Sequence, residues 1–406
     1  MEQQPDQNHW KANLSYLIAA QNFFLFGSSA VFFAILWYIA LKSSSGTWMM
    51  LTTLATTLPQ ILISLWAGTW SDRFKRRDLL VIASVFTSVF TIVIAIIYYF
   101  LDRNLWLLLA IAAIRSLGNG ISTPVANSLL PELTPKNRLT QANGINQTAN
   151  SILLLISPLV SGYILGNLGI IYVFVIDLIT SLGGIGVLLM IKEPEVKKFS
   201  QNEVKGSLSQ ITKGLRYTFD NRSLSLLMLF TVVGFILIAP SSQLSTLFVK
   251  RTFGTNVWLL TFNELFWTIG AALGGIFISL HSKIDNKIKW ITLGFIGSGF
   301  CFAAMGVVKP FWVYLVFMFG SGICMPIIQG TTNILIQETV PNEWMGRVFS
   351  ILQIVSTGIY PIAMLFFGPL ADVVAIKWIL VVTGLLLVVS AIGFYGRFKT
   401  KKFYIN

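Results

Sequence analysis

Apolar residues run in long, uninterrupted stretches along most of this chain. The segments 79–101 and 379–395, for example, contain no charged residue. A helix of about 20 residues, rising about 1.5 Å per residue, crosses the roughly 30 Å apolar core of a bilayer. The pattern therefore predicts an all-α, polytopic membrane protein. Twelve transmembrane helices are expected, over residues 14–40, 48–70, 79–101, 105–128, 143–165, 170–191, 224–248, 257–280, 288–308, 311–335, 347–370 and 376–396.

The longest polar stretch lies between the sixth and seventh spans and divides them into two six-helix halves. We expect an N-terminal half at 1–191, a cytoplasmic central loop at 192–223 and a C-terminal half at 224–406. A shift of 206 residues aligns five residues of the first half with identical ones in the second, namely Gly68 with Gly274, Glu132 with Glu338, Pro135 with Pro341, Gln147 with Gln353 and Gly162 with Gly368. Four of the matches fall in one stretch, which favours a parallel internal repeat.

Composition and charge agree with a membrane protein. Hydrophobic residues make up 55% of the chain and charged residues 11%, against about 25% charged in soluble domains. Of the 29 Lys and Arg, 22 fall on one set of connecting segments and six on the other. Since cytoplasmic loops carry the basic excess, both termini are expected in the cytoplasm. The net charge of +13 is spread over short loops, so no nucleic-acid partner is expected.

Several chemistries are not expected from this sequence. Cys301 and Cys324 lie in apolar spans and form no ligand pattern, so we expect no metal site. The chain has no Gly-rich Lys-Ser/Thr phosphate loop and no Ser/His/Asp cluster. We therefore expect no cofactor, no ATP-driven pump and no enzyme.

The loop after the second span carries the most specific motif. It reads Gly-Thr-Trp-Ser-Asp-Arg-Phe-Lys-Arg-Arg over residues 68–77. This resembles the signature loop of the major facilitator superfamily, although Lys75 stands where that family usually has glycine. The resemblance implies the fold of that superfamily and a cytoplasmic latch that holds the two halves together when the carrier faces outward. The residues of this latch are Gly68, Asp72, Arg73, Arg76 and Arg77. The alternative for its basic residues is that they only anchor the loop in the cytoplasm.

Three further motifs narrow the resemblance to the macrolide-efflux branch of that superfamily. They are Ile-Arg-Ser-Leu-Gly at 114–118, Leu-Thr-Gln-Ala-Asn-Gly at 139–144 and Gly-Arg-Val-Phe-Ser at 346–350. The fifth span also contains Pro158 and Gly162, similar to the antiporter signature of that superfamily, although Ser157 replaces its first glycine. A proline there can also be a simple kink. The branch implies a bacterial, multi-pass plasma-membrane protein that acts as a drug:proton antiporter.

Three ionisable residues fall within spans, where a charge costs at least about 2.5 kcal/mol. They are Arg115, Asp177 and Glu264, and all three could line one cavity. A carboxylate there can take up a proton and release it when the pathway opens inward or a cation approaches. We expect Glu264 and Asp177 to carry protons and Arg115 to act as the switch. The alternatives are that Arg115 pairs statically with one acid, or that Asp177 is solvated.

Polar and aromatic residues inside spans are candidates for the substrate cavity. Gln147 and Gln353 lie on polar stripes of the fifth and eleventh spans, and Gln21 and Asn22 lie in the first. Such stripes point inward, either to a cavity or to a hydrogen bond with a neighbouring helix. Phe26 and Phe266 belong to aromatic sets that could form an apolar pocket or face lipid.

Together these features predict a proton-coupled exporter of lipophilic or amphiphilic drugs such as macrolides, working by alternating access. Its partners are expected to be the small-molecule substrate, protons and membrane lipid, and the chain is expected to be a monomer. One alternative is an exporter of a natural metabolite, siderophore or lipid with the same fold. Another is a receptor or scaffold that does not transport.

Overall fold

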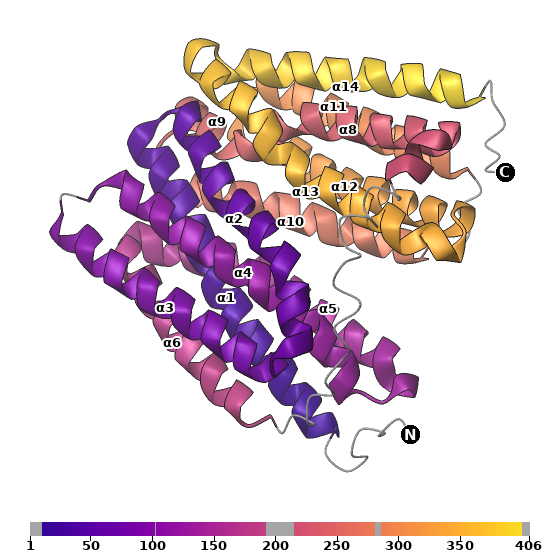
Figure 1. Cartoon of the computed structure of the whole chain (residues 1–406). Helices are drawn as coiled ribbons and strands as arrows, with labels where there is room; N and C mark the ends of the chain where they lie inside the picture. Colours follow the sequence, from indigo (N-terminus) through magenta and orange to yellow (C-terminus); the bar gives the residue numbers. More distant parts are fainter. Residues whose placement is uncertain (1–9, 102, 192–214, 281–285, 400–406) are drawn as a thin grey trace. The chain divides into compact units, whose positions relative to one another are not determined.

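The computed structural model describes residues 10–101, 103–191, 215–280 and 286–399 (Figure 1). Within these ranges, seven side chains are not described: Leu65, Gly68, Thr69, Asp72, Lys136, Asn342 and Lys399. The described chain is helical apart from short turns, which confirms the predicted all-α fold. It divides into two compact units, the first at 1–39 and 54–201 and the second at 40–53 and 202–406.

The helices of the first half of the chain follow each other with short connections. They are α1 (Trp10–Ser43), α2 (Gly46–Arg73), α3 (Arg76–Phe100), α4 (Leu105–Leu133), the short 3₁₀ helix η1 (Lys136–Arg138), α5 (Leu139–Asn167) and α6 (Ile170–Leu189). The ends of α1 and α2 that meet at residues 40–53 belong to the second unit, and the rest of both helices belongs to the first.

The second half repeats this order of long helices with one interruption. Its helices are α8 (Arg222–Gln243), α9 (Ser245–Phe253), α10 (Val257–Leu280), α11 (Lys287–Val307), α12 (Phe311–Thr339), α13 (Asn342–Val373) and α14 (Ile376–Lys399). Eleven of the twelve predicted spans each fall on one of these long helices, and the seventh is divided between α8 and α9. Eleven helices of the described ranges are long and apolar enough to cross a membrane, and α2 is a further helix of 28 residues. The protein is therefore a multi-pass membrane protein.

The seventh span is the one where the prediction of a single helix was wrong. The expected segment 224–248 is divided between α8 and α9, which meet at Leu244 with a ψ angle of −1°. Pro240 lies one turn earlier and has no backbone N–H, so the helix loses an internal hydrogen bond just before the break. The apolar pattern continues across both helices, which is why periodicity alone did not reveal the division.

Asparagine side chains mark where several helices begin. Asn104 accepts a hydrogen bond from the backbone N–H of Trp106 at the start of α4. Asn221 and Asn286 cap α8 and α11 in the same way. These side chains satisfy amides that a helix cannot pair internally. The turns before α6 and α10 contain Gly169 and Gly254, whose φ angles of 96° and 125° favour glycine.

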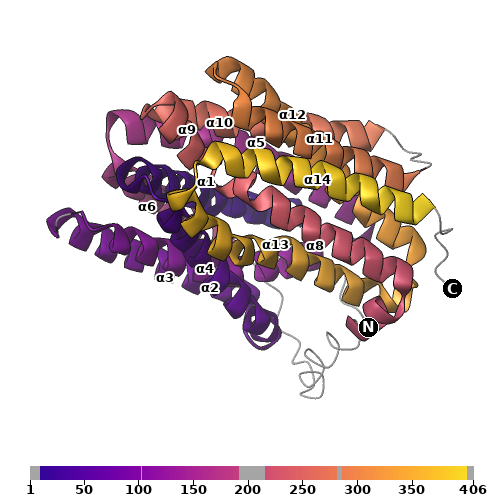
Figure 2. The same ribbon diagram turned by 90° about the horizontal axis from the view of Figure 1, so that it is seen from above.

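The two units repeat the same helix pairings. In the first, α3 packs against α4 and α6; in the second, α11 packs against α12 and α14. Figure 2 shows α14, α11 and α8 side by side in the second unit. There, Gly299 of α11 and Gly384 of α14 bring the two backbones together, since a Cβ on Gly299 would lie 2.6 Å from the Gly384 carbonyl oxygen. The repeated pairings agree with the internal repeat expected from the sequence.

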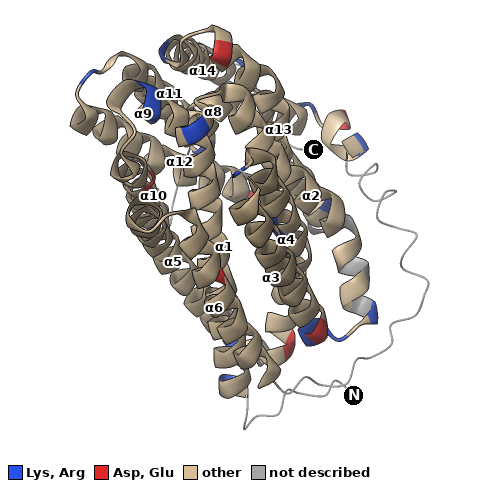
Figure 3. Cartoon of the chain, turned by 90° about the vertical axis from the view of Figure 1, so that its left-hand side faces the viewer, with Lys and Arg blue, Asp and Glu red and all other residues tan. Residues whose placement is uncertain are grey.

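Charged residues are concentrated towards helix ends and connections, and long stretches of most helices carry none (Figure 3). The exact division of the halves at 191 and 224 stays a prediction. Residues 192–214 of the expected central loop lie outside the described residues.

Candidate functional site

A buried ion pair joins α4 and α6 in the first unit. Arg115 Nη1 donates to Asp177 Oδ2 at 2.5 Å, and Nη2 donates to Oδ1 at 2.9 Å. The side chains of Arg115 and Asp177 are 11% and 2% exposed. The structure thus brings together two of the three predicted intramembrane charges, and the alternative of a solvated Asp177 does not hold.

The geometry explains how this pair is tolerated in an apolar unit. A bidentate guanidinium–carboxylate contact satisfies both charges with two parallel hydrogen bonds. Removing one partner of a buried pair leaves an uncompensated charge and costs about 3–5 kcal/mol. Any event that neutralises Asp177 therefore changes the energy of Arg115 strongly.

Helix α1 lies directly against the acid of this pair. A Cβ atom on Gly27 would lie 2.6 Å from Asp177 Oδ1 and would also overlap Thr180 Oγ1. One turn further along α1, the carbonyl of Ala30 accepts from Ser161 Oγ of α5 at 3.0 Å. The position of α1 is therefore tied to the ion pair by a contact that only glycine allows. Sequence reasoning missed Gly27, because a single glycine in an apolar helix carries no distinguishing signal.

Glu264, the third predicted charge, lies on α10 in the second unit. The neighbouring Asn263 is fully buried and accepts from the hydroxyl of Tyr314 on α12 at 2.7 Å. The Nδ2 atom of Asn263 lies 3.4 Å from Glu264 Oε1, which is a long contact. The expectation that Glu264 lines one cavity with Arg115 and Asp177 stays a prediction. The Asn263–Tyr314 bond joins residues 51 positions apart in sequence, so no local motif could have shown it.

The predicted cavity residues differ in their surroundings. Asn22 donates from Nδ2 to the carbonyl of Ile18 at 2.7 Å, and its buried Oδ1 has no hydrogen-bond partner among the described residues. Gln21, Phe26 and Phe266 are half-buried, while Gln147 and Gln353 are exposed. Asn22 is the cavity candidate with an unused acceptor, which a ligand donor could satisfy. The cavity role of the other residues stays a prediction.

Two of the three basic residues of the predicted latch, Arg76 and Arg77, form contacts within the first unit. Arg76 forms an ion pair with Glu132 at the end of α4 and donates to the carbonyl of Ser128 at 3.2 Å. Arg77 donates to the carbonyl of Ile191 at 3.1 Å. Arg73 is exposed. Gly68 and Asp72 lie in the last two turns of α2, and their side chains lie outside the described part.

The second unit carries an ion pair in the corresponding place. Lys287 at the start of α11 bonds Glu338 near the end of α12, at 2.7 Å. Glu338 is the residue that the internal repeat aligns with Glu132. Both units therefore join the ends of equivalent helices by a carboxylate and a cation, and the sequence repeat was the signal that could have paired them.

The antiporter-like motif lies inside an unbroken helix. Both Pro158 and Gly162 are buried, and α5 continues through them from Leu139 to Asn167. Ser157 Oγ donates to the carbonyl of Leu153 at 2.7 Å, next to the carbonyl that the proline leaves without its usual donor. Ser161, between the two, is the residue that bonds α1. The motif thus lies on the face of α5 that contacts α1.

Comparison with known proteins places this architecture in one family. The profile of the Major Facilitator Superfamily matches residues 17–359. Macrolide efflux protein A of Streptococcus pyogenes is 22% identical over 387 residues, covering 95% of this chain and 96% of that protein. Macrolide efflux protein A of Enterococcus faecalis is 23% identical over 309 residues, covering 76% and 96%.

Solved structures show the same fold. The crystal structure of a bacterial homolog of the human lysosomal transporter Spinster aligns with a TM-score of 0.70. It is 16% identical, and the alignment covers 97% of this chain and 98% of that one. These structures confirm the fold expected from the sequence. The family profile and the two relatives confirm the predicted resemblance to macrolide-efflux proteins of this superfamily.

Proposed function

The chain belongs to the Major Facilitator Superfamily, and from that premise we propose that it is a proton-coupled secondary active exporter of lipophilic or amphiphilic drugs such as macrolides. The substrate class is supported by similarity to Macrolide efflux protein A over 95% of this chain. The observation that carries the coupling is the buried Arg115–Asp177 pair. Transport proceeds by alternating access, with the substrate bound in one central site that opens to either side in turn.

Asp177 is the proposed proton acceptor. When a proton adds to one of its carboxylate oxygens, the negative charge is lost and the ion pair with Arg115 is weakened. Arg115 keeps its own proton throughout, because a guanidinium does not deprotonate in proteins. Return of the proton to solvent restores the carboxylate and the pair. Glu264 takes the equivalent role on α10 in the second unit.

The membrane potential supplies the driving force for this exchange. Each proton that crosses contributes about 2.3 kcal/mol per 100 mV. An inward proton can therefore drive an uncharged substrate outward against its gradient. For a singly cationic substrate the two charges cancel, so the pH difference alone drives a one-for-one exchange.

Helix α1 is the proposed link between substrate and proton. It carries Gln21, Asn22 and Phe26 just before Gly27, the residue that contacts Asp177. A substrate that hydrogen-bonds the unused Oδ1 of Asn22 would fix the position of α1. Because the contact at Gly27 leaves no free space, a shift of α1 must change the geometry of the carboxylate.

The other predicted site residues are proposed to act in the same transport cycle. Phe266, Gln147 and Gln353 are proposed to complete the substrate cavity, and Pro158 and Gly162 to hold α5 against α1. Gly68 and Asp72, with the basic residues that follow, are proposed as the cytoplasmic latch. The protein is proposed to act as a monomer in a bacterial plasma membrane with both termini in the cytoplasm.

A transport assay tests this function. The purified chain is reconstituted into vesicles, and a panel of macrolides and lipophilic dyes is followed with and without an imposed pH gradient. We expect at least one member to move against its gradient, and a protonophore to stop it. Vesicles without protein and vesicles with Asp177→Asn serve as controls. If no member of the panel moves, the proposed substrate class is wrong.

A further inference from the structure

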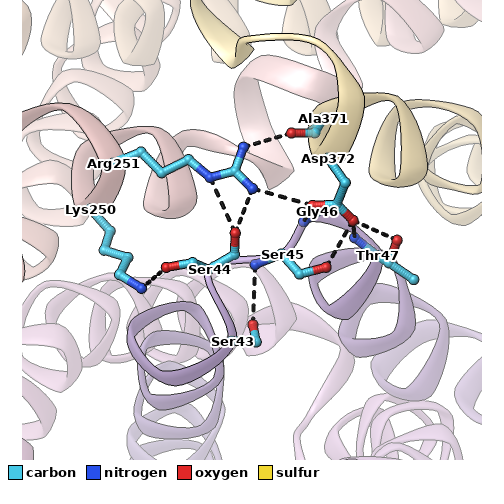
Figure 4. Close-up of polar contacts among 9 residues, drawn as sticks. All are labelled: Ser43, Ser44, Ser45, Gly46, Thr47, Lys250, Arg251, Ala371 and Asp372. Carbon is cyan, nitrogen blue, oxygen red and sulfur yellow. Dashed lines mark hydrogen bonds and ion pairs between the residues drawn. The ribbon is translucent and has the colours of Figure 1, made fainter.

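The turn between α1 and α2 is held by a carboxylate from the end of α13 (Figure 4). Asp372 Oδ1 accepts from the backbone N–H of Gly46 at 2.6 Å, and Oδ2 accepts from that of Thr47 at 2.9 Å. Oδ2 also accepts from the hydroxyls of Ser45 at 2.8 Å and Thr47 at 2.7 Å. Asp372 therefore caps the N-terminus of α2, where free amides and the helix dipole favour a negative charge.

Arg251 of α9 fastens the same turn from another direction. Its guanidinium donates to the carbonyls of Ser44 and Ala371, the latter at 2.6 Å, and lies 3.2 Å from Asp372 Oδ1. Figure 4 shows the guanidinium between the turn and the end of α13. One cation thus bonds the turn and the capping acid together.

Lys250 completes the arrangement around Ser44. Its ammonium donates to Ser44 Oγ and, at 2.8 Å, to the carbonyl of Leu41. Burial and the neighbouring Arg251 lower the pKa of Lys250. Ser44 has a φ of 52°, a conformation that residues other than glycine adopt rarely. The two basic side chains hold this turn in a shape that it would seldom take alone. We call the contacts among residues 44–47, Arg251 and Asp372 the clasp.

Backbone packing around the clasp is also close. A Cβ atom on Gly46 would lie 2.7 Å from the Cβ of Ala371, and one on Gly368 would lie 2.9 Å from the Gly46 carbonyl oxygen. The start of α2 and the end of α13 therefore approach closely at these two glycines. All of these residues belong to the second unit.

Only the ends of α1 and α2 at this turn belong to the second unit, and the rest of both helices belongs to the first. The chain leaves the first unit after residue 39 and returns to it at residue 54. Helix α2 carries the clasp at Gly46, its first residue, and the predicted latch residue Asp72 in its last turn. At about 1.5 Å per residue, these positions lie about 39 Å apart along one helix. In alternating access, one end of a carrier closes while the other opens.

We propose that Asp372 is a gating residue of the transport cycle, and that the clasp closes the end of α2 opposite the latch so that clasp and latch exclude each other. On the proposed orientation, the clasp closes the outer side while the carrier is open to the cytoplasm. This inference rests on the proposed alternating-access function. It assigns closure of the outer side to Asp372, Arg251 and residues 44–47, because the predicted latch closes only the cytoplasmic side.

Hydrogen exchange of backbone amides tests the proposal, because the clasp protects the amides of Gly46 and Thr47 directly. The full-length protein in lipid nanodiscs is compared with the variants Asp372→Asn, Asp72→Asn and Lys377→Gln. Loss of a hydrogen bond to a charged group should make the amides of residues 45–47 exchange roughly tenfold faster in Asp372→Asn. Lys377→Gln, which changes a cation outside the clasp, should leave them unchanged.

The decisive comparison is the rate of amide exchange at the end of α2 opposite each substitution. When two sites are coupled, each changes the equilibrium at the other by the same factor, commonly about fivefold or more. Asp72→Asn should therefore slow exchange at residues 45–47 by about that factor, and Asp372→Asn should slow exchange at residues 70–77. Effects confined to the mutated end in both variants would overturn the proposal and make the clasp a fixed anchor.

Transport by the same preparations separates this proposal from the proposed function. If the exchange is reciprocal but no drug is moved, the clasp is a gate and the proposed substrate class fails. If pH-driven drug transport is intact while the exchange effects are only local, the exporter remains and the gate fails.

Discussion

Neutralising the buried ion pair in steps separates its role in transport from its role in folding. The single variants Asp177→Asn and Arg115→Gln each remove one charge and leave the partner buried. The double variant removes both charges and keeps two polar side chains, of which asparagine matches aspartate in shape and glutamine is shorter than arginine. If Asp177 carries the proton, neither the single variants nor the double variant should show transport driven by a pH gradient.

The size of the stability effect follows from the burial of the pair. The two side chains are 11% and 2% exposed and share two hydrogen bonds of 2.5 and 2.9 Å. Breaking such a pair from one side costs about 3–5 kcal/mol, mostly because the remaining charge is uncompensated. We therefore expect Asp177→Asn to lower the free energy of unfolding by about that amount. The double variant should recover most of it, because no unpaired charge is left.

Two assays on each variant measure its stability and its pH-driven transport separately. Unfolding in mixed micelles is followed by loss of helical circular dichroism, and transport is followed in vesicles with an imposed pH gradient. The exposed pair of Arg216 and Asp220, with side chains 86% and 73% exposed and 3.7 Å apart, provides a control. Asp220→Asn should change stability only slightly, since surface ion pairs contribute little.

One result would refute this reasoning directly. If the double variant of Arg115 and Asp177 folds and still transports in response to pH, the pair is only a static structural contact. Proton coupling would then have to rest on Glu264 or on groups outside the first unit.

Three further substitutions test neighbouring parts of the site. Glu264→Gln should abolish pH-driven export in vesicles while helical content and membrane insertion stay normal. Gly27→Ala should cost about 1–3 kcal/mol of unfolding free energy, because its methyl group overlaps the acid on α6, whereas Gly186→Ala, with no atom within 4 Å of its Cβ, should be neutral. Tyr314→Phe should lower stability in the same unfolding assay by about 1–3 kcal/mol, because the buried Asn263 loses its donor; an unchanged value would mean that water replaces the hydroxyl.

The sequence predicts the fold well because hydropathy acts along the chain. Every predicted span except the seventh coincides with one long helix. The charges within spans stand out in the sequence because a lone charge in a membrane is costly. Hydropathy does not show which side chains from different helices bond to each other. The bond between Asn263 and Tyr314 and the capping of Gly46 by Asp372 join residues 51 and 326 positions apart. No local pattern encodes such contacts.

The break after α8 and the contact at Gly27 were missed for a related reason. Both depend on the shape of a neighbouring backbone rather than on polarity. Asp372 and Arg251, viewed in the sequence alone, are ordinary charges near the ends of spans. The motif Ser-Ser-Gly-Thr at 44–47 is typical of a helix start, but the acid that caps it comes from another helix.

The most direct test of proton-coupled export is to let the substrate drive the proton. Vesicles containing the protein and a pH-sensitive dye are loaded with a macrolide that the transport panel has identified, then diluted into drug-free buffer at equal pH. An antiporter predicts that the lumen becomes acidic as the drug leaves, and that Asp177→Asn abolishes this change. Drug efflux with no pH change, or with the lumen becoming alkaline, would contradict the account.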